Sequence, residues 1–193
     1  MEHKGTVTLQ TERLILRPFT MDDVDAAFRN WESDDQVTKY LRWPTYTDPA
    51  DTATIMQKWV DSYVDPTFYQ WAIVPKELGE PIGSISVVDH DDRTQKVHIG
   101  YCIGSKWWGM GYITEAYAKV ISFLFEEVKA LRIESQHDPN NPASGRVMQK
   151  CGMTYEGTLR KADWSNQGIV DACMYGLLAE EYFEKSALDN RNF

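Results

Sequence analysis

A chain of 193 residues, 42% of them hydrophobic, can bury one substantial core, so we expect a single domain over residues 1–193 with its core at about 9–180. The formal net charge of −9 at pH 7 disfavours nucleic acid, anionic membranes and other polyanions as partners. No run approaches the roughly 18 apolar residues of a membrane span, and three scattered cysteines fit neither a disulfide framework nor a thiolate metal site. These features predict a cytoplasmic protein without a metal.

The N-terminal third of the chain combines one short strand with helices. The run 14–19 predicts a strand ended by a proline, and Thr20, followed by acidic residues, predicts a helix start. A further helical turn is expected over 35–41. Pro49 is expected to begin a longer amphipathic helix.

The middle of the chain changes to strand-like periodicity. Three apolar runs, 69–74, 81–88 and 97–103, are separated by short polar stretches, which predicts an antiparallel meander built on local turns. The segment 112–127 then has the spacing of a long amphipathic helix.

The C-terminal third is expected to alternate strand and helix. We predict a strand at 132–137, a helix at 143–150 closed by Gly152, and strands at 154–159 and 169–178. The whole pattern predicts an α+β (mixed α/β) domain with a central, mostly antiparallel sheet flanked by helices.

The step from the third meander strand into the long helix passes through Gly109 and Gly111. Glycine lets the backbone approach a ligand closely and point N–H groups at it, and a following helix adds the positive end of its dipole. A pyrophosphate suits such a turn, although an ordinary strand-to-helix turn would have the same sequence. The turn is not a dinucleotide-binding fingerprint, because Thr114 stands where the third glycine would be.

Two spaced motifs make a family resemblance specific. The turn 106–111 is followed about 30 residues later by Asn141-Pro142-Ala143-Ser144 and then by Lys150-Cys151-Gly152-Met153, which resembles the GNAT acyltransferases. Further motifs resemble the RimJ/RimL branch of protein N-terminal acetyltransferases: Thr11–Arg17, Ile99–Tyr101, Trp108–Tyr112 and Glu156–Arg160. The similarity covers nearly the whole chain. One departure is Lys106, where the superfamily carries arginine or glutamine.

The resemblance implies that acetyl-CoA is the co-substrate and that a primary amine, on a protein N-terminus or a small molecule, is the acceptor. It implies backbone pairing of the pantetheine arm with Cys102 and Ile103, a hydrogen bond from Asn141, and Ser144 facing the thioester sulfur. The full set of implied cofactor-binding residues is Cys102, Ile103, Lys106, Trp108, Gly109, Met110, Gly111, Tyr112, Ile113, Asn141, Ser144 and Lys150. In the alternative interpretation, Asn141 and Ser144 are ordinary polar residues at a helix start and Lys150 is a solvated helix residue.

Acyl transfer to an amine requires an uncharged nucleophile, so a base is expected to assist. His98 is the first candidate, because relatives often carry a glutamate two residues before the glycine of Ile99-Gly100-Tyr101, and histidine has an ordinary pKa of about 6.5. Ser144 is the candidate proton donor to the departing thiolate. No acyl-enzyme is needed if amine and thioester bind together, so direct attack in a ternary complex is expected. Alternatively, His98 only packs on the sheet.

The aromatic residues Tyr40, Trp43 and Trp71 are candidates for the wall of an amine pocket, where a cation would favour their π faces; aromatic residues also commonly belong to the core. A non-catalytic acyl-CoA-binding module or sensor is the alternative function. The resemblance further implies a possible homodimer, for which the strand 169–178 could supply an edge.

Overall fold

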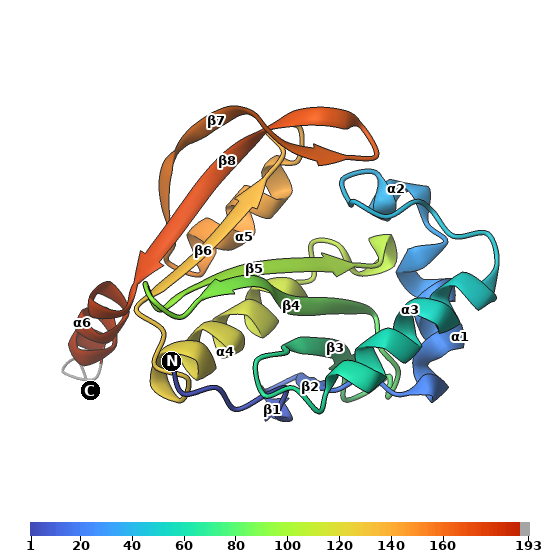
Figure 1. The fold of residues 1–193 in the computed structure, drawn as a ribbon, viewed down its shortest axis with the longest axis horizontal. Helices are drawn as coiled ribbons and strands as arrows, with labels where there is room; N and C mark the ends of the chain where they lie inside the picture. The colour runs from blue at the N-terminus through green and yellow to red at the C-terminus, as the bar shows by residue number, and fades with distance from the viewer. Residues whose placement is uncertain (190–193) are drawn as a thin grey trace.

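The computed structural model describes residues 1–189 (Figure 1). Its centre is one eight-stranded sheet in the order β1-β2-β3-β4-β5-β6-β8-β7. The strands are β1 (Leu9–Gln10), β2 (Leu14–Arg17), β3 (Gln70–Pro75), β4 (Gly83–Asp91), β5 (Lys96–Ile103), β6 (Arg132–His137), β7 (Thr154–Ser165) and β8 (Gly168–Leu178). The predicted meander and mixed α/β class are confirmed.

The sheet opens between β5 and β6. Every neighbouring pair is antiparallel except β5 and β6, which are parallel and paired only over Lys96–His98 and Arg132–Glu134. Beyond that point the Ser135 hydroxyl donates to the Ile99 carbonyl, and the strands then diverge (Figure 1). The rest of β5 therefore has no strand partner on its β6 side.

Helices cover both faces of the sheet. The helical elements are a 3-10 turn (Met21–Asp23), α1 (Val24–Ala27), a π-helix (Phe28–Glu32), α2 (Asp35–Thr38), α3 (Pro49–Ser62), a 3-10 turn (Ser105–Trp107), α4 (Tyr112–Glu126), α5 (Pro142–Lys150) and α6 (Ala179–Asp189). α4 and α5 pack on one face through the larger apolar cluster, whereas α1 and α3 pack on the other face through a smaller one. Figure 1 shows α3 and α4 on either side of the meander strands.

Strand β3 illustrates how the two apolar clusters form. Its side chains alternate, so that Trp71 and Ile73 belong to the α4 cluster while Ala72 and Val74 belong to the α1–α3 cluster. All four are buried. Because both faces of this strand are covered, its sequence is continuously apolar instead of alternating with polar residues.

The C-terminal part differs from expectation in two ways. β7 extends to Ser165, and helix α6 follows β8 where no helix was predicted. The expectation that strand 169–178 supplies a free edge is wrong, because β8 pairs with β6 on one side and with β7 on the other. The long β7 therefore forms the outer edge at this end of the sheet. Across residues 1–189 no helix is long and apolar enough to cross a membrane.

Candidate active site

The turn before α4 exposes a row of backbone amides. Gly109 and Gly111 have φ values of +76° and +82°, the left-handed region that side chains disfavour. Within the described part of the chain, nothing accepts a hydrogen bond from the backbone N–H groups of residues 109–114. These donors lie at the positive end of the α4 dipole, so they form a site for an anion.

Arg13 holds this turn from the neighbouring strand hairpin. Its Nη1 donates to the Met110 carbonyl at 3.0 Å, its Nε lies 2.6 Å from a Glu115 oxygen, and its guanidinium stacks 4.5 Å from the Tyr112 ring centre. Burial acts to raise the pKa of Glu115, but hydrogen bonds from Thr11 and Arg13 outweigh it and lower that pKa. Glu115 is therefore an ionised structural anchor for the turn.

The remaining residues of the turn are open to solvent. Trp108 and Met110 are 49% and 52% exposed, and Lys106 is exposed in the 3-10 turn that precedes them. Tyr112 donates to a Glu77 oxygen at 3.2 Å. A hollow of about 270 Å³ lies beside the turn and is lined by Pro75, Glu77, Leu78, Trp107 and Tyr112.

The diverging edge of β5 carries backbone groups that lack a strand partner. The Gly104 N–H donates to the Ile82 carbonyl, directly before β4, at 2.9 Å, and Cys102 is in register with Ser84 of β4. Because N–H and C=O directions alternate along a strand, Cys102 points its backbone toward β4. The expectation that Cys102 pairs with a pantetheine arm is therefore wrong, because Tyr101 and Ile103 present their backbone to the open side instead. There the Ile103 carbonyl accepts a hydrogen bond from Trp108 Nε1 at 3.0 Å.

The N-terminus of α5 meets this edge across the opening. Asn141 occupies the N-cap position, yet its side chain caps no N–H of the helix. The Ser144 hydroxyl lies 2.9 Å from the hydroxyl of Tyr101, which also donates to the Ser144 carbonyl at 3.0 Å. Burial raises the pKa of Tyr101, so this phenol is a neutral donor at neutral pH.

Sequence reasoning used Tyr101 only as part of a motif and missed it as a site residue. The sequence did contain an indication of this role, because the Ile99-Gly100-Tyr101 motif places a polar phenol near the end of a meander strand.

Lys150 is exposed at the end of α5. The next residue, Cys151, contacts the Thr114 carbonyl at 3.5 Å, so the end of α5 lies beside the first turn of α4.

His98 is the last β5 residue paired with β6 before the strands diverge. Its neighbours Val97 and Ile99 belong to the α4 cluster, so His98 faces the other side of the sheet. Burial lowers the pKa of His98, while Glu134, whose oxygen lies 3.8 Å from His98 Nδ1, acts against that shift. Glu134 is itself held by Lys96 at 2.8 Å. His98 is therefore neutral at neutral pH and can accept a proton.

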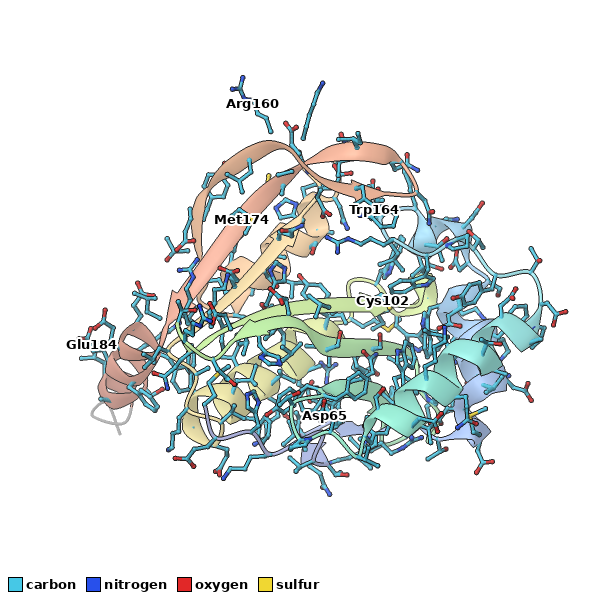
Figure 2. All side chains as sticks on the ribbon, in the orientation of Figure 1. Asp65, Cys102, Arg160, Trp164, Met174 and Glu184 are labelled. Atoms are coloured by element: carbon cyan, nitrogen blue, oxygen red, sulfur yellow. The ribbon has the colours of Figure 1, made fainter. Side chains whose placement is uncertain are left out.

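We name residues 39–48 the cover segment, since they lie over this face between α2 and α3. The Tyr40 hydroxyl donates to the Asn140 carbonyl at 2.8 Å, and Arg42 pairs with Asp163 of β7 at 2.6 Å. At the β7–β8 turn, Asn166 Nδ2 donates to the Trp43 carbonyl at 2.6 Å. Figure 2 shows the neighbouring Trp164 on the part of β7 nearest α2.

Trp71 does not line this face. Its side chain is completely buried, stacks at 5.6 Å on Tyr69, and meets Phe123 of α4 edge-on at 5.9 Å. Its Nε1 donates to the Val7 carbonyl at 2.8 Å. The expectation that Trp71 walls an amine pocket is wrong, because alternation along β3 turns it toward the opposite face of the sheet.

Glu32 is a buried acid that sequence reasoning missed. It ends the π-helix, is 1% exposed, and neither carboxylate oxygen has a hydrogen-bond partner among the described residues. Burial raises the pKa of Glu32, and the nearby Thr52 hydroxyl acts against that shift without outweighing it. Burial also raises the pKa of the Cys102 thiol to about 11, with a further contribution from nearby Glu32. In the sequence, an acid at the end of a helical run resembles a solvated helix face.

Comparison with known proteins agrees with this geometry. A family model described as an acetyltransferase (GNAT) domain matches residues 13–154. The chain is 32% identical over 175 residues to the uncharacterized N-acetyltransferase p20 of Bacillus licheniformis, a match that covers 91% of this chain and 98% of that protein.

Solved structures show the same fold. An acetyltransferase of the GNAT family from Bacillus anthracis has a TM-score of 0.80 at 27% identity, with 91% of this chain and 100% of that chain covered. RimL, a ribosomal L7/L12 α-N-protein acetyltransferase solved with coenzyme A, has a TM-score of 0.80 at 19% identity, with 91% and 99% covered. The chain therefore belongs to the GNAT acetyltransferase family and is an N-acetyltransferase.

Proposed function

We propose that this enzyme transfers an acetyl group from acetyl-CoA to a primary amine, on a protein N-terminus or on a small molecule, by direct attack within a ternary complex. The single observation that carries the proposal is the row of unpartnered amides at residues 109–114 beside the unpaired edge of β5. A protein with a net charge of −9 repels an anionic nucleotide overall, so it needs such a local device.

The residues present fit this co-substrate. The amides of residues 109–114 suit its diphosphate, and the backbone of Tyr101 together with the Ile103 N–H suits the amides of its pantetheine arm. Asn141, whose side chain caps no helix N–H, is available for a further hydrogen bond. Lys106 and Lys150 are exposed cations that can approach phosphate oxygens.

The proposed reaction uses His98 and Ser144 at the two ends of the opening. A lysine amine has a pKa of about 10.4 and a protein N-terminus about 7.7–8.0, so the acceptor arrives largely protonated. His98 accepts a proton from the acceptor, and the free amine then attacks the thioester carbon. The new C–N bond forms as the C–S bond breaks, and the proton that the nitrogen loses passes to the departing sulfur. The Ser144 hydroxyl, which lies beside the Tyr101 hydroxyl, relays that proton or donates a hydrogen bond to the sulfur.

The acceptor is proposed to bind on the face beneath the cover segment. Tyr40 and Trp43 lie in that segment, and their rings suit a cationic amine. The carboxylates of Glu134 and Asp163 face the same side from β6 and β7 and add negative potential, although Lys96 and Arg42 partly neutralise them.

Release of free thiol from acetyl-CoA, measured against a panel of peptides and small amines, tests the proposal. We expect turnover with at least one primary amine and tight binding of coenzyme A by calorimetry. Binding of coenzyme A without turnover on any amine would support the non-catalytic module instead. The absence of any binding would remove the proposal entirely.

A further inference from the structure

At the end of β4 farthest from the β5–β6 opening, three metal-ligating side chains converge. His3 comes from the N-terminal segment, His90 from β4, and Asp92 from the β4–β5 turn. One ligand atom from each lies within 4.8 Å of the other two. His3 Nε2 is 2.9 Å from Asp92 Oδ1, and the two imidazole ring centres are 5.0 Å apart.

The ring of His90 gives independent evidence for a bound ion, because one of its nitrogens has no hydrogen-bond partner in the part of the chain that the structure describes. Its Nδ1 is buried, and none of the residues from 1 to 189 forms a hydrogen bond with it. A buried polar nitrogen without a partner is unfavourable and rare in folded proteins. An ion bound at this ring would supply an interaction that the surrounding chain does not.

His3 is oriented as a metal-binding histidine would be. Its side chain is only 10% exposed, and its Nδ1 lies 3.0 Å from the Tyr69 hydroxyl, whose oxygen also accepts from the Lys4 N–H at 3.1 Å. With the ring proton on Nδ1 and donated to Tyr69, the Nε2 lone pair is free to bind an ion on the side of Asp92. Histidine ligands commonly donate their second ring N–H to such a partner.

We propose that His3, His90 and Asp92 form a binding site for one divalent transition-metal ion, with Zn²⁺ as the expected occupant. Two imidazole nitrogens with one carboxylate suit Zn²⁺, whereas Mg²⁺ and Ca²⁺ prefer all-oxygen ligands. Asp92 is 56% exposed, which leaves the remaining coordination position open to water. The site does not touch the acetyl-transfer residues.

The ion would join the N-terminal segment to the β4–β5 turn. Asp65 lies near both histidines and adds negative potential, whereas the amine of Met1, 3.7 Å from Asp92 Oδ1, is a cation that the metal must displace. Because the ion binds only the folded arrangement, it stabilises the folded protein increasingly, by RT ln(1 + L/Kd), as its free concentration L rises. The ligands are far apart in the sequence, so no spacing motif marks them, and this site opposes the expectation of a protein without a metal.

The test uses the full chain after treatment with a chelator. Co²⁺ is titrated as a spectroscopic probe, Zn²⁺ is added in competition, and the metal bound per chain is counted. We expect one ion per wild-type chain and a melting temperature that rises with Zn²⁺ but not with Mg²⁺. His90→Gln and Asp92→Asn should lose the ion, whereas the matched variants His98→Gln and Asp91→Asn should keep it.

A further variant separates metal binding from folding. Tyr69→Phe keeps all three ligands and should weaken Zn²⁺ binding by about tenfold. Because it also removes the acceptor of the Lys4 N–H, its metal-free melting temperature should fall, so the effect on the ion is measured as the Zn²⁺ affinity and as the Zn²⁺-induced rise in the melting temperature of each variant. The proposal is overturned if wild type takes up no ion, if His90→Gln binds as well as wild type, or if Zn²⁺ leaves the melting temperature unchanged. In that case His3 and Asp92 form a hydrogen bond only. Thiol release from acetyl-CoA is measured separately, so this outcome does not bear on the acetyl-transfer proposal.

Discussion

At the scale of single residues, a few backbone and side-chain groups lack hydrogen-bond partners within the described part of the chain. The amides of residues 109–114 are one such set, and the carboxylate of Glu32 is another. The glycine turn could be read from the sequence because the α4 start needs left-handed backbone at Gly109 and Gly111. The burial of Glu32 could not be read from the sequence, since it depends on how α1, α3 and β5 pack.

Replacing Gly109 with alanine tests the amide row. Gly109 and Gly79 have φ values of +76° and +74°, and an added Cβ would contact nothing at either position. Both alanine variants should therefore lose similar stability, about 1–2 kcal/mol. Only Gly109→Ala should weaken coenzyme A binding, by about tenfold. The alanine side chain disfavours the left-handed backbone at residue 109, so the turn shifts and displaces the backbone amides of residues 109–114. Equal binding by the two variants in calorimetry would contradict the assignment.

Replacing His98 with alanine tests the base. Burial keeps the pKa of His98 below its ordinary value, so the wild-type side chain accepts protons down to acidic pH. We expect His98→Ala to lose about 10²- to 10⁴-fold in kcat where the amine is protonated, and to approach wild type at high pH. The measurement is a pH–rate profile with one amine acceptor.

His137→Ala is the comparison for that profile. His137 Nδ1 lies 2.7 Å from the Asp138 carbonyl, and its ring packs under Gly145, so its loss should not change the shape of the profile. If the pH–rate profile of His98→Ala matches that of wild type, His98 is not the base. If only His137→Ala changes the shape of the profile, His137 is the base instead.

At the scale of elements, the cover segment and the β7–β8 turn border the proposed acceptor face. The cover segment reaches β7 and β8 through Arg42 and through the Asn166 side chain, which donates to the carbonyls of Thr38 and Trp43. Helix starts and strand runs were predictable, because caps, prolines and periodicity are local. The length of β7 and the docking of its turn were not, because both depend on partners distant in sequence.

Asn166→Ala should loosen the cover segment. The variant loses two hydrogen bonds of about 0.5–1.5 kcal/mol each, so the KM for the acceptor should rise several-fold. Coenzyme A binding should remain unchanged, because α4 is not involved. Gln167→Ala is the control, since the Gln167 side chain forms no hydrogen bond within the described chain. Steady-state kinetics with the acceptor varied would contradict the role if both variants behaved alike.

At the scale of the whole molecule, stability should respond to the buried charge of Glu32. Burial raises the pKa of Glu32 in the folded state above the ordinary value of 4.5 that the side chain has in the unfolded chain. The folded state therefore binds the proton more tightly, and stability falls as pH rises from about 4.5 through the folded-state pKa. Removing the charge should relieve this loss.

Glu32→Gln should accordingly melt at a higher temperature than wild type at pH 8, with the difference shrinking toward pH 4.5. Glu127→Gln, which changes an exposed acid just after α4, should melt like wild type at every pH. Thermal unfolding followed by circular dichroism across this pH range provides the measurement. A Glu32→Gln protein that is less stable than wild type at pH 8 would show that the carboxylate has a favourable partner.

The amino-acid sequence by itself determined the strands of the meander, the helices that begin at Pro49 and Tyr112, the glycine turn and the family. Each of these depends on local periodicity, caps or glycine conformations that neighbouring residues encode. Only the tertiary structure decided that Trp71 is core, that Cys102 turns its backbone to β4, that β8 is not an edge, and that Tyr101 meets Ser144. These outcomes depend on strand register and on contacts between distant segments, which no local pattern specifies.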